Sequence, residues 1–331
     1  MAFENLSERE KQILANLINH YIGTADPVGS RVIANKFKMG LSSATIRNTL
    51  QDLEELGLVE QPHTSAGRVP TDIGYRVYVD CLLRPDMLSE DEKKYIKQGI
   101  LKEGKGVREV LGQTAKLLGE VTSQLGISIA PRFEVGILKD IRLISVAEGR
   151  LMVIVIVRSG LARSLILEVE AAISVDVIQE VEAYLNERLR GLSLSEIRDT
   201  ISKRLADVSG KARLIKLVID SKDKIWAEDR GDDLLISGKE NLLVMPEFAS
   251  HEKLLAMLRV LDDGKVLSDF LDQVQDENLI ITIGRESAVS EIINCSLVTA
   301  SYRVGKIHGT VGIIGPTRLP YNKAVSIVQY T

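Results

Sequence analysis

The stretch SSATIRNTLQDLEELGLVEQPHTSAGRVPTDIGYRVYVD, residues 42–80, decides the fold of the N-terminal part of the chain. Ser42 is a favourable N-cap and Gly57 a favourable left-handed end, so a helix is expected between them. A short strand from Leu58, turn formers at 63–67 and a returning strand at 68–69 then predict a β-wing, followed by a tyrosine-rich helix. The apolar residues on one face of the first helix are Ile46, Leu50, Leu53 and Leu56.

Two further helices precede this stretch. Ser7 followed by Glu10 is a capping box, which begins a helix over residues 7–22. Ser30 can cap a short second helix, and a tight turn that contains Gly40 then leads into the helix after Ser42. Two helices joined in this way have helix-turn-helix geometry. The N-terminal part is therefore predicted to be a winged helix-turn-helix.

The face of the third helix opposite its core face has the side chains of a DNA reader. Arginine can bind guanine, asparagine and glutamine can pair with adenine, and alanine can touch the thymine methyl group. Acidic residues fill the C-terminal half of this helix, where they would repel phosphates, so the N-terminal half is expected to enter the major groove. The residues predicted to face the bases are Ala44, Arg47, Asn48 and Gln51.

Basic and hydroxyl side chains around this helix are suited to the DNA backbone. Basic residues can neutralise phosphates, and hydroxyl groups near a helix N-terminus can donate hydrogen bonds to them. The alternative is that the N-terminal module uses the same surface to contact another protein, but three helices and a wing in this order favour DNA. The predicted backbone contacts are Arg31, Lys36, Lys38, Arg68, Ser42, Ser43 and Thr45.

Length and composition indicate a multidomain globular protein. The chain has 331 residues with 45% hydrophobic and 27% charged residues, which excludes a disordered chain and favours two or three domains. The net charge of −4 gives no overall sign of a nucleic-acid partner, so charge must be judged locally. The two cysteines are far apart in sequence, the N-terminus is polar and acidic, and no long apolar run is present. A cytoplasmic protein is expected.

Arg84–Pro85 marks a predicted domain boundary, because a proline disfavours helix in the residue before it. Ser89 and Glu92 form a second capping box, and an amphipathic helix continues to Val121. Residues 135–170 predict an antiparallel meander, residues 175–230 helices, and residues 234–245 and 279–314 further strands. This order favours an α+β domain interrupted by a mainly helical insertion.

Other classes of function lack a motif in this sequence. The glycines at 305–315 fit neither dinucleotide-binding nor phosphate-loop spacing, and His251 has no second histidine at zinc spacing. An enzyme would need a nucleophile elbow, metal motif or cofactor fingerprint, and a metabolite sensor would need a cluster of polar pocket residues. No catalytic residue, cofactor or metal is expected, and an enclosed polar pocket would favour the sensor.

Three segments together resemble one family. PVGSRVIA at 27–34, the stretch at 42–80 and GTVGIIGPTRLPYNKAV at 309–325 are similar to the HrcA family of heat-inducible transcription repressors. The resemblance covers both ends of the chain, and its PHTSAGR wing and GYR helix are long and specific. One departure is that Leu319 and Pro320 stand where the family pattern has Met and Asp.

The resemblance implies a homodimer that represses bacterial chaperone operons such as groESL and dnaK. It would bind the inverted-repeat CIRCE operator on the nucleoid, leave it on heat shock and depend on the chaperonin GroEL. It also implies a winged helix at 1–85, a GAF-like α/β domain at 86–174 and 246–331, and an inserted dimerisation domain at 175–245. The operator-binding residues then include the third helix and, in the wing, His63, Thr64 and Arg68.

Overall fold

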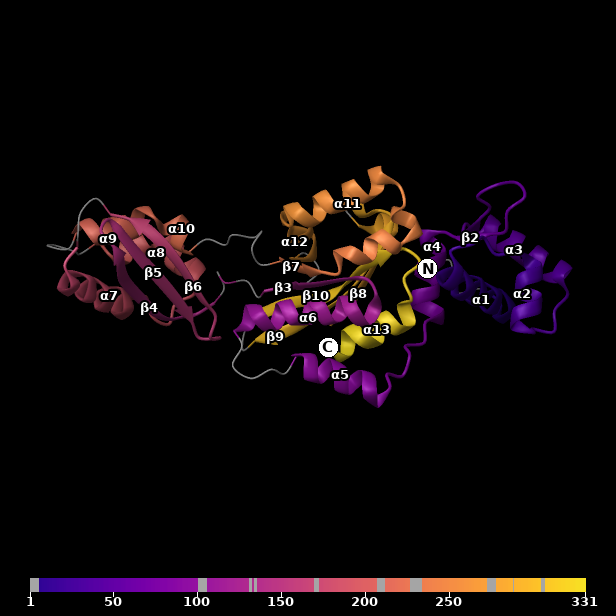
Figure 1. Cartoon of the computed structure of the whole chain (residues 1–331), viewed down its shortest axis with the longest axis horizontal. Helices are drawn as coiled ribbons and strands as arrows, with labels where there is room; N and C mark the ends of the chain where they lie inside the picture. The colour runs from indigo at the N-terminus through magenta and orange to yellow at the C-terminus, as the bar shows by residue number, and fades with distance from the viewer. Residues whose placement is uncertain are drawn as a thin grey trace.

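The chain forms three units along one long axis, as the computed structural model shows (Figure 1). A winged helix lies at one end, a central unit in the middle and a separate insertion at the other end. The structure describes residues 6–100, 106–130, 133, 136–169, 173–206, 212–226, 234–272, 278–287, 289–304 and 307–331. Among the described residues, no helix combines the length and apolar character that crossing a membrane requires.

The winged helix has the predicted order of elements. The Ser7 capping box is formed, since the Ser7 N–H donates to Glu10 at 2.7 Å and the Ser7 hydroxyl accepts from the Glu10 N–H at 3.3 Å. Apolar side chains from all three helices, such as Ile13, Ile33 and Ile46, meet in a fully buried core. The elements are α1 (Glu8–Thr24), α2 (Ser30–Phe37), α3 (Ser43–Glu55), β1 (Val59–Glu60) and β2 (Val69–Pro70).

A short helix connects the wing to the central unit. Thr71 caps α4 (Asp72–Val77) by accepting from the Gly74 N–H at 3.1 Å, and the helix continues as a π-helix over Tyr78–Leu82. The second predicted capping box is also formed, because the Ser89 N–H donates to Glu92 at 2.9 Å before α5 (Glu90–Ile100).

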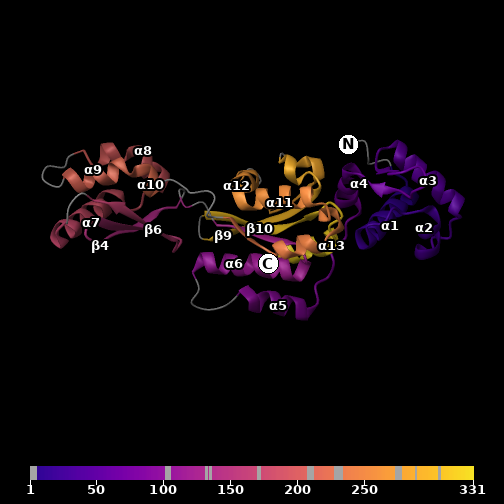
Figure 2. The ribbon, with the colours of Figure 1, turned by 45° about the horizontal axis from the view of Figure 1, so that its top comes forward.

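The central unit is a five-stranded antiparallel sheet with helices on both faces (Figure 2). Ile313 and Ile314 are adjacent in one strand and fully buried on opposite faces, in two different hydrophobic cores. One face is covered by α5, α6 (Val107–Thr122) and α13 (Tyr321–Tyr330), and the other by α11 (His251–Asp263) and α12 (Lys265–Asp272). In spatial order, the strands are β7 (Leu234–Ser237), β3 (Leu125–Ile129), β10 (Ile307–Pro316), β9 (Cys295–Val304) and β8 (Leu279–Ile283).

The insertion is an independent sheet covered by helices on one face. Its three strands pair as an antiparallel meander, and Val153 and Val155 of the middle strand pack with Val181 and the buried Trp226 of the helices. The strands are β4 (Leu138–Ala147), β5 (Arg150–Val157) and β6 (Ala162–Glu168). The helices are α7 (Val175–Leu189), α8 (Leu194–Arg204), α9 (Ala212–Asp220) and α10 (Lys222–Trp226).

The insertion has different borders and composition from those expected. The meander was expected to belong to the central domain, with the insertion over 175–245, but β4–β6 share a core with α7–α10 and form a sheet of their own. The insertion therefore contains a three-stranded sheet in addition to its helices. It follows β3 and precedes β7, which pair with each other through Ile129 and Leu234. The expected strand at 234–245 ends at Ser237 and gives way to 3-10 helices, Lys239–Val244 and Pro246–Phe248.

Candidate nucleic-acid interface

The exposed face of α3 carries all four residues predicted to face DNA bases. The Ser42 hydroxyl caps the helix by accepting from the Thr45 N–H at 3.1 Å, and it lies 2.9 Å from the Thr45 hydroxyl. Ile46, Leu50 and Leu53 are buried, which turns the opposite face outward. The side chains on that outward face are Ala44, Arg47, Asn48 and Gln51.

Leu56 does not belong to the core face where the helical pattern placed it. It is 47% exposed, because α3 ends at Glu55 and Leu56 is the C-cap. The backbone leaves the helix there, with Gly57 at φ 73°, so the helical period no longer decides which way the side chain points. Thr49 instead completes the buried side of the helix, and its hydroxyl donates to the Thr45 carbonyl at 3.2 Å.

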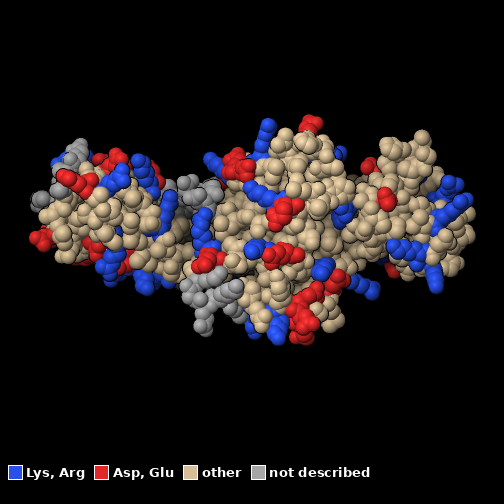
Figure 3. All heavy atoms as spheres, viewed as in Figure 1, with Lys and Arg blue, Asp and Glu red and all other residues tan. Residues whose placement is uncertain are grey.

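Basic side chains surround the reading face. Arg31, Lys36 and Lys38 are exposed on and after α2, and Figure 3 shows basic residues gathered at this end of the winged helix with few acidic ones. Lys36 has a partner within the protein, because its ammonium donates to His20 Nδ1 at 2.9 Å. Burial, followed by the charge of Lys36, lowers the pKa of His20. His20 was not predicted to bear on this site.

Ser43 links the two helices of the helix-turn-helix. Its hydroxyl lies 3.1 Å from the Ser30 hydroxyl, so the N-terminal ends of α2 and α3 are in contact. Ser30 is the first residue of α2, and Gly29 occupies the N-cap position that the sequence suggested for Ser30. The Ser43 hydroxyl therefore helps to hold the angle between the two helices.

Arg68 fixes the wing to the helices and differs in this from the other predicted phosphate ligands. Its guanidinium donates to Glu54 at 2.7 Å, and both side chains are mostly buried, at 19% and 32% exposure. Its backbone pairs with Val28, since the Val28 N–H donates to the Arg68 carbonyl at 2.8 Å. A Cβ on the neighbouring Gly67 would lie 2.4 Å from the Val28 backbone, so the close approach requires glycine.

The tip of the wing is exposed and internally braced. His63 and Thr64 are both exposed, as a role in contacting DNA requires. Gln61 donates to the carbonyls of Thr64 and Ala66, each at 3.0 Å, and so closes the tip. Sequence reasoning missed Gln61 because no spacing rule marks a side chain that reaches back across a turn.

Features of other site classes are sparse. Among the described residues, no three potential metal ligands gather in one place. Cys81 is exposed and Cys295 is buried, where desolvation raises the pKa of its thiol to about 12. A cavity of about 260 Å³ beside α6 is lined mainly by apolar residues such as Val110, Leu111 and Val311. It is not the enclosed polar pocket that would favour a metabolite sensor.

Two family models together match most of the chain. The "HrcA protein C terminal domain" matches residues 108–325. The "Winged helix-turn-helix transcription repressor, HrcA DNA-binding" domain matches residues 5–79, which contain the reading face and the wing.

Curated relatives match over the full length. A protein of Desulforamulus reducens is 36% identical over 327 residues, covering 98% of this chain and 94% of the relative. A protein of Chlorobium chlorochromatii is 39% identical over 335 residues, covering 100% of this chain and 96% of the relative. Both are named heat-inducible transcription repressor HrcA. The crystal structure of a hypothetical protein, 24% identical, has the same fold at a TM-score of 0.64, covering 98% of this chain and 96% of its own.

Proposed function

Because the chain belongs to the HrcA family of heat-inducible transcription repressors, with a DNA-binding winged helix, we propose that it represses class I heat-shock operons such as groESL and dnaK. It acts as a dimer on the inverted-repeat CIRCE operator, and heat shock releases it. The observation that carries this proposal is the outward face of α3, where Arg47, Asn48 and Gln51 are exposed beside the basic residues of α2.

In this proposal the N-terminal half of α3 enters the major groove. Arg47 grips a guanine, Asn48 and Gln51 pair with adenines, and Ala44 contacts a thymine methyl group. Asp52 and Glu55 are exposed in the C-terminal half of α3, where phosphates would be repelled. The residues assigned to the DNA backbone are Arg31, Lys36, Lys38, Ser42, Ser43 and Thr45, with His63 and Thr64 in the wing.

A gel-shift titration tests the proposal. The protein is titrated against a duplex that carries the inverted repeat and against one with a scrambled half-site, and tight binding to the intact repeat alone is expected. Arg47→Ala should cost about 1–3 kcal/mol on the operator and relax base specificity, whereas Lys36→Ala should weaken binding to every sequence and reduce the salt slope. Arg259→Ala, an exposed arginine on α11, is the matched control. Equal losses on operator and random DNA would remove Arg47 from the base-reading set.

The dimer is assigned to the insertion, whose sheet has one face that the described helices of the insertion do not cover. Buried residues of β5 alternate with Met152 and Ile154, which point to this other face. Met152 pairs with Ile144 of β4 and Ile166 of β6, which are 46% and 53% exposed. A continuous apolar stripe crossing three strands is typical of an interface, and a second copy of the chain would bury it.

Ile166→Asp tests this dimer surface. A charge in a buried apolar interface should weaken dimerisation at least tenfold, as measured by sedimentation, because the carboxylate loses its hydration without gaining a partner. Val175→Asp is the control, since Val175 is also an exposed apolar residue, at 65%, but lies at the start of α7. A dimer that withstands Ile166→Asp would place the interface elsewhere.

The central unit and the chaperonin complete the proposal. The five-stranded antiparallel sheet with helices on both faces supports a GAF-like assignment for the central unit.

The chaperonin GroEL would restore misfolded repressor to the active dimer. On heating, other misfolded proteins compete for the chaperonin, so less repressor is restored and repression is relieved. Operator binding after a heat pulse, measured with and without chaperonin and ATP, tests this link. Full recovery without chaperonin would refute it.

A further inference from the structure

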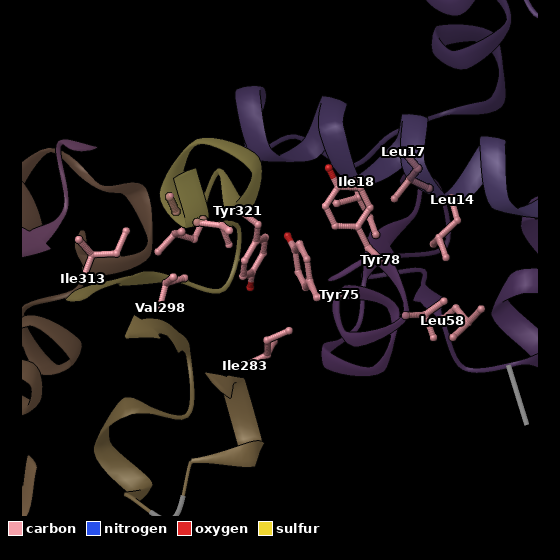
Figure 4. Close-up of a cluster of buried hydrophobic side chains, with 14 of the residues drawn as sticks. Leu14, Leu17, Ile18, Leu58, Tyr75, Tyr78, Ile283, Val298, Ile313 and Tyr321 are labelled. Carbon is pink, nitrogen blue, oxygen red and sulfur yellow. The ribbon is translucent and has the colours of Figure 1, made fainter. Parts of the chain in front are cut away.

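The winged helix is packed and bonded onto the central unit. A single hydrophobic core runs through both, from Leu14 and Leu17 of α1 to Val298 and Ile313 of the sheet. Figure 4 shows Tyr75 of α4 facing Tyr321 of α13 at the centre of this core, with ring centroids 5.9 Å apart. The winged helix, which we call the reading head, is therefore held against the central unit by a buried contact. The central unit sets its position.

Arg76 provides the most extensive polar contact across this boundary. Its Nε donates to Glu286 Oε1 at 2.7 Å, and a second nitrogen donates to the other oxygen of the same carboxylate. That second nitrogen also donates to the Ile281 carbonyl at 2.6 Å, while the third nitrogen donates to Asp80 at 3.1 Å. A guanidinium that binds both oxygens of one carboxylate in this bidentate way is fixed in orientation as well as in position.

The loop that binds Arg76 is held in shape by hydrogen bonds of its own and by a contact from Asp72. The Ile283 N–H donates to Glu286 at 2.8 Å, which holds the carboxylate ready for the guanidinium. One turn away from Arg76 on α4, Asp72 accepts from the Arg285 N–H at 3.1 Å. Gly284, between Ile283 and Arg285, has φ +53°, and a Cβ at this residue would lie 2.5 Å from the Asp72 carboxylate. A side chain at residue 284 would displace the Asp72 carboxylate, so glycine preserves the Asp72 contact with the Arg285 N–H.

Further contacts fix the winged helix on its other sides. The Tyr78 hydroxyl lies 2.7 Å from Asn19 of α1 and 2.8 Å from Asn322 of α13. Arg318 donates to the Ile22 carbonyl at the end of α1 at 3.0 Å and is itself paired with Glu247. Contacts to α1 and α4 come from different parts of the central unit, so they oppose rotation of the reading head.

We propose that Arg76 is a positioning residue that sets the angle of the reading head and thereby selects the spacing between the two operator half-sites. This inference rests on the proposed dimeric function. One turn of DNA takes about 10–10.5 base pairs, so each added base pair rotates one half-site about the axis by roughly 35°. A head held at a fixed angle matches one spacing, whereas a head released from Glu286 can follow a rotated half-site.

The test uses duplexes whose half-sites are separated by spacers that increase one base pair at a time through a full turn. Wild-type protein should bind one spacing at least tenfold better than the least favourable one. In Arg76→Ala and Glu286→Gln this ratio should fall at least threefold, while affinity for a single half-site stays within twofold of wild type. Arg76→Lys should restore part of the ratio, and Arg259→Ala, remote from the boundary, should leave it unchanged.

Each outcome decides between the proposals. If wild type binds a single half-site as tightly as two half-sites at every spacing, the dimeric function is refuted, and the positioning role with it. If it prefers two half-sites over one but binds every spacing equally, only the positioning role is refuted. A sharp wild-type profile that both variants keep would overturn only the positioning role. So would a uniform loss of affinity that includes the single half-site, because it would mean damage to the winged helix itself. Glu286→Gln keeps the shape of the side chain, so it decides the matter if Arg76→Ala fails to fold.

Discussion

Replacing Gly74 by alanine should destabilise the winged helix, although alanine is the better helix former. In the interior of a helix, alanine is favoured over glycine by about 1 kcal/mol. A Cβ at Gly74 would lie 2.0 Å from the Leu58 carbonyl oxygen, which is backbone and cannot rotate away. Overpacking of this kind costs about 1–3 kcal/mol. The steric term should prevail because the contact is so short, with a net loss of up to about 2 kcal/mol.

Gly112→Ala gives the opposite sign and is the matched control. Gly112 is also helical, in α6, but among the described residues the nearest atom to its Cβ would be Leu235 Cδ1 at 4.0 Å. Alanine should therefore stabilise the central unit by about 0.5–1 kcal/mol. Urea denaturation followed by circular dichroism gives both values, with amide exchange in α1 and α3 to assign the transition. The single tryptophan, Trp226, is buried in the insertion and should report no change in Gly74→Ala. A Gly74→Ala protein as stable as wild type would refute the reasoning.

Two further predictions concern charged groups of the winged helix. Arg68→Ala should lower operator affinity by loosening the wing, but it should leave the salt dependence of binding unchanged, since Glu54 already neutralises Arg68. Lys38→Ala should reduce the slope of log affinity against log salt by about 0.9. An equal reduction of the slope in both variants would show that Arg68 contacts a phosphate. The winged helix should lose stability as the pH falls below about 6.5, because the lowered pKa of His20 means that the unfolded chain takes up its proton first. His20→Asn should flatten this part of the pH profile in thermal melts, and an unchanged profile would exclude His20 as its source.

Local features of the fold were predictable from sequence, because neighbouring residues decide them. The Ser7 and Ser89 capping boxes and the Ser42 cap formed as expected, and the helical period identified the exposed face of α3. The same period wrongly placed Leu56 on the core face, because the helix ends at Glu55, one residue earlier.

Contacts between distant segments were not predictable, because no local pattern records a partner. The sequence predicted that residues 135–170 pair as an antiparallel meander, which β4–β6 confirm. Nothing along the chain showed that this meander forms a sheet of its own, while β3 pairs with β10 in the central sheet. In the same way, the sequence offered no sign that Arg68 meets Glu54 across the wing or that Arg76 meets Glu286 across the domain boundary.

The pairing of β3 with β10 also dictates the order in which the chain can acquire its structure. Residue 129 pairs with residue 310, so the central sheet cannot close until nearly the whole chain has left the ribosome. The winged helix and the insertion close over much shorter loops and can form earlier. The loop and helix that anchor the winged helix, with Glu286 and Tyr321, belong to this last segment. A newly made chain therefore carries a finished reading head before anything holds it at its working angle.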